Sequence, residues 1–140
     1  MQDLIEQLKR HEGVKTHAYK DHLGYITVGV GRCLEDGIGV GLSEDEIDYL
    51  LLNDIKRCSL ELNTEFDWFS GLDAVRKDAM INLCFNVGLP RLKGFVKALA
   101  AMEVQDYGTA ADEFFDSRWA TQVGNRAVEV CAMIRTGENQ

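Results

Sequence analysis

The sequence predicts an α+β fold in which a small antiparallel sheet lobe and a larger all-helical lobe are joined by one long helix. Three observations support this prediction. Residues 25–30 are a run of β-branched and aromatic residues preceded by a turn. Residues 44–63 carry apolar residues at helical spacing behind a capping box. From residue 70 onward, further apolar segments also have helical spacing.

Length and composition indicate one folded domain over residues 1–140. Of these residues 46% are hydrophobic and 27% are charged, which is an ordinary globular composition. No apolar run approaches the roughly 20 residues needed to span a bilayer, and the first ten residues have scattered charges rather than a basic start and an apolar stretch. We therefore expect a cytoplasmic chain with no stable membrane insertion and no export signal of its own.

The net charge of −8 is concentrated in one segment. Between Glu35 and Asp67 there are ten acids and two bases, so the acids and bases of the remaining chain cancel. This acidity argues against general nucleic-acid binding, while a neutral or locally basic cleft elsewhere in the chain is still allowed.

Neither the cysteines nor the histidines indicate a metal site. The four cysteines lie far apart with no paired short spacing, so we expect them to be reduced, and a native disulfide is the less favoured alternative. His11, His17 and His22 span a helix end and a turn rather than one face, which makes metal ligation the minor alternative. We expect no metal and no cofactor.

The first helix is expected to end at a carboxylate. Leu4 and Leu8 have the spacing of one helix face, with Asp3 as a candidate N-cap. Glu12 continues the apolar face, and Gly13 then ends the helix. A carboxyl group half withdrawn from water favours its protonated form, which suits a proton donor. The alternative is a surface Glu at a frayed helix end.

A strand with an open face is expected next, over residues 25–30, after a turn at residues 21–24. With a period of two, one face of this strand carries Tyr25, Thr27, Gly29 and Gly31. One hydroxyl and two missing side chains leave space for a ligand close to the main chain. Alternatively, the glycines serve only a bulge or a tight hairpin.

Two carboxylates and a hydroxyl fall within this short segment. Asp21 follows Glu12 after eight residues, and Thr27 follows Asp21 after five. These are the groups needed to cleave an acetal with water, one carboxyl as acid and the other handling the attacking water. The sequence therefore makes Glu12, Asp21 and Thr27 candidate catalytic residues.

The remaining chain is expected to be helical after a glycine-rich segment, 34–42, that closes the sheet. Ser43 and Glu46 make a capping box at the start of a helix roughly 30 Å long. A helix over 72–87, which Ser70 with Asp73 starts, is apolar around nearly its whole circumference and should be the central buried helix. Further helices are expected at 92–102, 107–115 and 126–134.

Two other segments have alternative interpretations. Phe66, Trp68 and Phe69 could stack on a sugar, but their place before the central helix favours the core. Residues 91–101 carry three bases among apolar residues and could be read as a membrane-active amphipathic helix. Three bases are weak support for that, so we favour ordinary packing in a bundle.

With these residues in place, the chain resembles the phage lysozymes of glycoside hydrolase family 24, of the T-even phage type. The segments Glu12-Gly13, Tyr19-Lys20-Asp21, Gly24-Tyr25 and 27–31 are similar to the family's catalytic segment. The similarity continues in the same order through the helical part, at 72–76, Ile81-Asn82 with Phe85, Gly94-Phe95, 117–119, 125–127 and 135–137.

The resemblance implies a lysozyme-like fold with its active-site cleft between the lobes: a sheet lobe at about 13–42, a connecting helix at about 44–63, and a helical lobe from about 1–12 and 64–140. It implies hydrolysis of the β-1,4 bond between N-acetylmuramic acid and N-acetylglucosamine of bacterial peptidoglycan. Glu12 would be the general acid, Asp21 would position and activate the water, and Thr27 would orient it. The family inverts configuration, which needs carboxyl groups roughly 6.5 to 9.5 Å apart.

The resemblance also implies substrate-binding roles for Gly31, Phe85, Asn86 and Arg126. Arg126 matches the family arginine that reaches the catalytic Glu, and Asn86 stands where relatives carry Gln. Arg32 stands where relatives often have His, and Asp54 matches the usual partner of that His. We therefore expect an ion pair between Arg32 and Asp54.

The implied partners are peptidoglycan glycan strands, with no nucleic acid. A monomer is expected. Without an export signal, the enzyme would stay in the host cytoplasm until a holin opens the membrane, and would then reach the periplasm and cell wall. The alternatives are a lytic transglycosylase, a non-catalytic peptidoglycan-binding module, or a purely structural protein.

Overall fold

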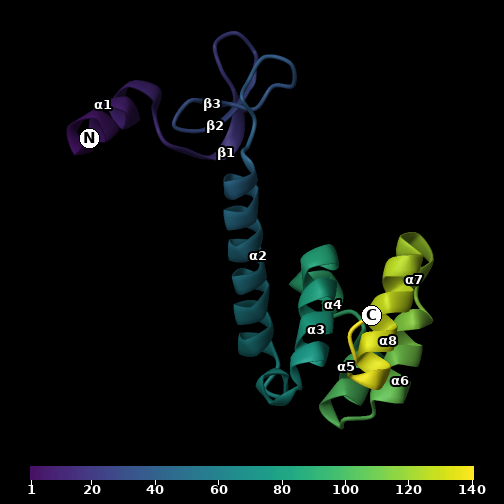
Figure 1. The fold of residues 1–140 in the computed structure, drawn as a ribbon. Coiled ribbons are helices and arrows are strands. Elements are labelled where there is room, and N and C mark those ends of the chain that lie inside the picture. The colour runs from purple at the N-terminus through teal and green to yellow at the C-terminus, as the bar shows by residue number, and fades with distance from the viewer. The chain divides into compact units, whose positions relative to one another are not determined.

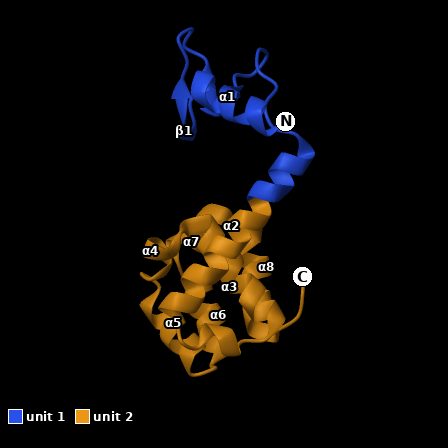
Figure 2. Cartoon of the chain, turned by 90° about the vertical axis from the view of Figure 1, so that its left-hand side faces the viewer, with its two compact units in different colours: residues 1–50 blue, residues 51–140 orange.

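The computed structural model describes residues 1–140 and divides into two compact units, Met1–Leu50 and Leu51–Gln140 (Figure 2). We call these the N-terminal unit and the C-terminal unit. Together they contain a three-stranded antiparallel sheet and eight α-helices, which confirms the predicted α+β class (Figure 1). The lobe boundaries expected from the sequence, with residues 1–12 assigned to the helical lobe, stay a prediction.

The N-terminal unit begins with helix α1, Gln2–Glu12. Gly13 ends the helix as predicted, with φ of 79° and its N–H bonded to the carbonyl of Lys9. The prediction that Asp3 is the N-cap was wrong, because Met1 holds that position and Asp3 lies in the first turn. An acid in the first turn interacts favourably with the helix dipole, which also explains its presence there.

The sheet has the order β1-β2-β3, with strands Lys15–Lys20, Ile26–Gly29 and Arg32–Cys33. The central strand, β2, is one residue shorter at each end than predicted. Thr27 pairs with Tyr19 on one side and with Cys33 on the other. The glycine-rich segment was expected to close the sheet, but β3 ends at Cys33 and residues 34–43 form a loop with one turn at 36–38. Gly39 lies so close to the carbonyl of Cys33 that no side chain fits there, so this loop folds back on the strand.

The long helix α2, Glu44–Glu65, begins in the N-terminal unit and continues into the C-terminal unit. The predicted capping box is confirmed. The N–H of Ser43 donates to Oε1 of Glu46 at 3.0 Å, and the N–H of Glu46 donates to Oγ of Ser43 at 3.2 Å. The helix starts where the sequence predicted and extends two residues further.

The C-terminal unit contains the hydrophobic core. It is built from a short 3-10 turn at Phe69–Gly71 and from α3 (Ala74–Val87), α4 (Leu89–Leu92), α5 (Val96–Glu103), α6 (Tyr107–Phe115), α7 (Arg118–Val123) and α8 (Asn125–Thr136). Every buried hydrophobic residue lies in this unit, and among those with no exposed surface are Leu62, Met80, Leu83, Phe114 and Ile134. Helix α7 was not predicted. It is six residues long, too short for a clear period, although Ser117 caps it by accepting from the N–H of Ala120.

The aromatic residues before α3 belong to this core, as predicted. Phe69 is 2% exposed, and the rings of Phe66 and Trp68 stack with centroids 5.0 Å apart. Leu92 and Leu99 are buried too, so the segment 91–101 packs in the bundle as expected. All four cysteines are free. No helix combines the length and the apolar character that crossing a membrane requires.

Candidate active site

Asp21 is held by the turn between β1 and β2. Its Oδ1 accepts hydrogen bonds from the backbone N–H groups of Leu23 and Tyr25, both at 2.9 Å. Its own N–H donates to the carbonyl of Tyr25 at 2.9 Å. An Asp side chain that bonds the backbone two residues on is typical of a tight turn, and here it fixes the carboxylate plane. Oδ1 is thus occupied, while Oδ2 has no protein partner and can accept from a water molecule.

Thr27 is the one buried polar residue of the chain, with 3% of its surface exposed. It lies in the central strand, and its Oγ1 donates to the carbonyl of Tyr25 at 2.9 Å. The hydroxyl proton is therefore committed to the protein, and the oxygen lone pairs are left to accept from another group. Asp21 and Thr27 are connected through the same carbonyl oxygen.

Glu12 ends α1, and its carboxyl group lies over Gly31. A Cβ on Gly31 would be 2.7 Å from Oε2 and 3.0 Å from Cδ of Glu12. Gly31 therefore provides the space that the Glu12 side chain occupies, in the turn between β2 and β3. The side chain of Glu12 is exposed, which does not agree with the partial withdrawal from water expected from the sequence. The reason is that the apolar face of α1, with Leu4, Ile5 and Leu8, is exposed as well.

The three predicted catalytic residues are thus arranged along β2, all within the N-terminal unit. Asp21 lies in the turn before the strand, Thr27 lies within it, and the carboxyl of Glu12 lies against the turn after it. At a rise of about 3.3 Å per residue, the backbone of the four-residue strand spans about 10 Å. The two carboxyl groups are therefore associated with opposite ends of a short strand.

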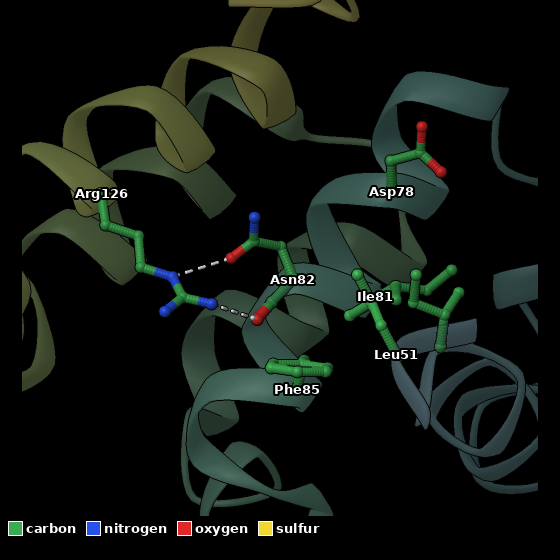
Figure 3. A pocket seen from close by; sticks show the side chains of 7 residues that line it. Leu51, Asp78, Ile81, Asn82, Phe85 and Arg126 are labelled. Carbon is green, nitrogen blue, oxygen red and sulfur yellow. Dashed lines mark hydrogen bonds between the residues drawn. The ribbon is translucent and has the colours of Figure 1, made fainter. Parts of the chain in front are cut away.

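A pocket of about 410 Å³ lies in the C-terminal unit (Figure 3). Its walls come from α2, α3 and α8, and the residues that line it are Leu51, Ile55, Asp78, Ile81, Asn82, Phe85 and Arg126. Figure 3 shows Arg126 reaching from α8 to Asn82 on α3. Its Nε donates to Oδ1 of Asn82 at 2.9 Å, and its Nη2 donates to the carbonyl of Asn82 at 3.4 Å. The pocket thus combines an apolar wall with one fixed cation.

Two of the predicted substrate-binding residues, Phe85 and Arg126, line this pocket, and Asn86 does not. The side chain of Asn86 accepts from the indole Nε1 of Trp119 at 2.7 Å, which ties α3 to α7. Asp78 and Asn82 also line the pocket; Asp78 was not singled out from the sequence, and Asn82 was named only in the matching segment Ile81-Asn82, with no pocket role. They lie at positions i and i+4 with Ile81 and Phe85 at i+3 and i+7, which is one face of a helix. This partly polar face was not recognised, because the sequence of α3 was interpreted as apolar around the whole helix.

The predicted ion pair between Arg32 and Asp54 was wrong. Nη1 of Arg32 lies 2.7 Å from Oε2 of Glu46, whereas Asp54 pairs with Arg57 at 2.7 Å. Glu46 is in the first turn of α2, beside the sheet, and Asp54 is two turns or about 12 Å further along the helix. The hydrogen bond from Arg32, followed by the bonds from Ser43, lowers the pKa of Glu46 to about 2.

Comparisons with known proteins show the family to which this chain is related. The family model described as "Phage lysozyme" matches residues 9–135. The chain is similar to "Probable T4-type lysozyme 1" of Dictyostelium discoideum, with 30% identity over 94% of this chain and 93% of that protein. It is also similar to the "Endolysin" of Salmonella phage P22, at 31% identity over 79% of this chain and 77% of that protein. The "Endolysin" of Acyrthosiphon pisum secondary endosymbiont phage 1 is 29% identical over 81% of this chain and 74% of its own length.

Proposed function

Because this chain belongs to the phage lysozyme family and is a lysozyme hydrolase, we propose that it cleaves the β-1,4 bond between N-acetylmuramic acid and N-acetylglucosamine of bacterial peptidoglycan. The observation that carries the proposal is the placement of Glu12, Asp21 and Thr27 along one short strand and its two turns. These residues provide an acid, a base and a hydroxyl acceptor for one water molecule.

In the proposed mechanism, Glu12 donates its proton to the glycosidic oxygen that leaves. Asp21 accepts a proton from the attacking water at Oδ2, since its Oδ1 is already bonded to the N–H groups of Leu23 and Tyr25. The hydroxyl oxygen of Thr27 accepts a hydrogen bond from the other O–H of that water, because its own proton is donated to the carbonyl of Tyr25. Water thus adds to the sugar, and the leaving oxygen takes the proton of Glu12.

We propose that the reaction inverts the configuration of the sugar. An inverting enzyme keeps its two carboxyl groups roughly 6.5 to 9.5 Å apart to make room for the water, whereas a retaining one brings them to about 5 Å. The association of Glu12 and Asp21 with opposite ends of β2 supports the wider spacing. A nucleophilic role for Asp21 would require the carboxylate to reach the sugar directly, but its Oδ1 is fixed in the turn.

Four further residues are proposed to contact the glycan strand. Phe85 offers an exposed ring and Arg126 a fixed guanidinium in the pocket of the C-terminal unit. Asn86 has its amide nitrogen free for a sugar hydroxyl, because only its oxygen is bonded to Trp119. Gly31 allows the glycan to approach the backbone beside Glu12.

The biological role we propose is that of an endolysin, because endolysins are among the relatives. In this proposal, the monomeric enzyme stays in the host cytoplasm until a holin opens the membrane. It then digests the cell wall from the periplasm. Expression of the enzyme inside bacterial cells tests this dependence: the cells should lyse only after their inner membrane is permeabilised, and lysis without permeabilisation would contradict it.

Product analysis of digested peptidoglycan tests the proposed chemistry. We expect the wild type to release muropeptides with a reducing N-acetylmuramic acid, and Glu12→Gln to release none. Glu6→Gln is the matched control, since Glu6 is an exposed acid on the same helix, and it should leave the activity unchanged. Products lighter by one water, as 1,6-anhydro sugars are, would show a lytic transglycosylase instead. Full activity of Glu12→Gln would remove Glu12 from the mechanism.

A further inference from the structure

The peptide unit between Tyr25 and Ile26 connects the two groups that handle the water. Its carbonyl oxygen accepts from the backbone N–H of Asp21 and from the hydroxyl of Thr27, both at 2.9 Å. The N–H of Tyr25 also holds the carboxylate of Asp21. The orientation of this peptide unit therefore acts on the hydroxyl of Thr27 directly, and on Asp21 through its backbone N–H and through Tyr25.

The N–H of the Tyr25–Ile26 peptide has no backbone acceptor, because the sheet does not continue regularly beyond β3. Leu34 donates its N–H to the carbonyl of Ile26 at 2.7 Å. Because β3 ends at Cys33, the carbonyl of Leu34 does not accept from the N–H of Ile26. Instead, Oε2 of Glu35 accepts from the N–H of Ile26 at 2.9 Å. A carboxylate side chain thus takes the place of the missing backbone acceptor.

Glu35 is itself anchored by the turn that follows β3. Its carbonyl accepts from the N–H of Gly39 at 2.8 Å and from that of Ile38 at 3.2 Å, and its side chain is half-buried. The next residue, Asp36, is an exposed acid and makes no side-chain hydrogen bond or ion pair. Of two neighbouring acids, only Glu35 contacts the sheet.

We propose that Glu35 is a positioning residue, which fixes the Tyr25–Ile26 peptide and thereby aims Asp21 and Thr27 at the attacking water. The peptide unit is planar and trans, so an acceptor that fixes its N–H also fixes the direction of its C=O. Glu35 makes no contact with the substrate in this role. The inference rests on the proposed function, since it concerns the residues that activate the water.

Three variants test this role with soluble, uncross-linked glycan strands as the substrate. We expect Glu35→Ala to lower kcat about five- to tenfold with KM almost unchanged, since misplaced catalytic groups slow the chemical step without weakening binding. Glu35→Gln should keep most of the wild-type kcat, because its amide oxygen can still accept from Ile26. Asp36→Ala removes the same charge from the next position and should behave as the wild type. A Glu35→Ala kcat equal to that of Asp36→Ala, or a Glu35→Gln variant as slow as Glu35→Ala, would overturn the proposal.

Amide hydrogen exchange, measured by NMR without substrate, separates this inference from the proposed function. We expect Glu35→Ala to speed exchange at Ile26 and at the two donors to Asp21, Leu23 and Tyr25, while Asp36→Ala leaves all three unchanged. Unchanged exchange at these amides in Glu35→Ala would refute the positioning role, even if the wild type released no reducing sugars. Absence of reducing sugars from the wild type would itself refute only the proposed hydrolysis.

Discussion

Replacing Gly31 by alanine tests whether Glu12 acts from the position it has in the structure. A Cβ at this residue would lie 2.7 Å from Oε2 of Glu12, whereas non-bonded atoms of this kind prefer about 3.5 Å or more. The carboxyl group must therefore move by about 1 Å. The backbone is affected too, because Gly31 has φ of 66°, where a residue with a side chain is strained.

The backbone strain mainly affects stability, whereas the displacement of the Glu12 carboxyl group mainly affects the rate. Strain at positive φ should lower the free energy of unfolding by about 1–2 kcal/mol. Moving the end of a flexible, exposed side chain adds little to that loss. Misplacing a catalytic group by about 1 Å can lower the rate by about 100-fold, so we expect kcat to fall between about 10- and 100-fold.

Gly41→Ala is the matched control for this prediction. Gly41 has φ of 63° and lies in the same unit, and a Cβ added there would have no other atom within 4 Å. Urea unfolding should show a similar loss of stability for both variants, and release of reducing sugars should show a loss of kcat for Gly31→Ala alone. Equal kcat values for the two variants would show that the contact with Gly31 does not place Glu12 for catalysis.

Two further predictions concern stability. The pKa of Glu46 is about 2 instead of the ordinary 4.5, so its contribution to stability is complete above pH 4.5 and is lost as the pH falls toward 2. The urea midpoint of the wild type should fall more steeply over this window than that of Glu46→Gln, and parallel curves would contradict the assignment. The guanidinium of Arg76 donates to the carbonyls of Ile134 and Arg135 at the end of α8, at 2.6 and 3.1 Å. We expect Arg76→Ala to lower the free energy of unfolding by about 2 kcal/mol in urea titrations, with Lys77→Ala as the control, and equal values for the two would exclude this role.

The parts of the fold that the sequence predicted well depend on short-range interactions. The capping box of Ser43 and Glu46 and the end of α1 at Gly13 each involve residues at most four positions apart. The central strand was predicted for the same reason, since its β-branched run and the Asp21 turn are continuous in the chain. Asp3 was misassigned because both a cap and a first-turn position suit an acid.

The parts that the sequence missed depend on contacts across the fold. Arg32 pairs with Glu46 because the first turn of α2 lies beside the sheet. The residue pattern does not show which turn of the helix lies near Arg32. The hydrogen bond from Ile26 to Glu35 exists because β3 is only two residues long, whereas the sequence predicted a longer sheet. Asn82 was overlooked as a pocket residue because its bond to Arg126 joins helices 44 positions apart. The candidate catalytic residues were found because all three belong to one continuous segment.

The configuration of the first-formed product distinguishes directly between a water-activating and a nucleophilic Asp21. Proton NMR during digestion of soluble glycan strands can follow the anomeric proton of the new reducing N-acetylmuramic acid before it mutarotates. If Glu12 acts as the acid and Asp21 activates a water on the opposite face of the sugar, the β-linked substrate must give the α-anomer first. First appearance of the β-anomer would contradict this account, because it would require a covalent intermediate and a nucleophilic Asp21.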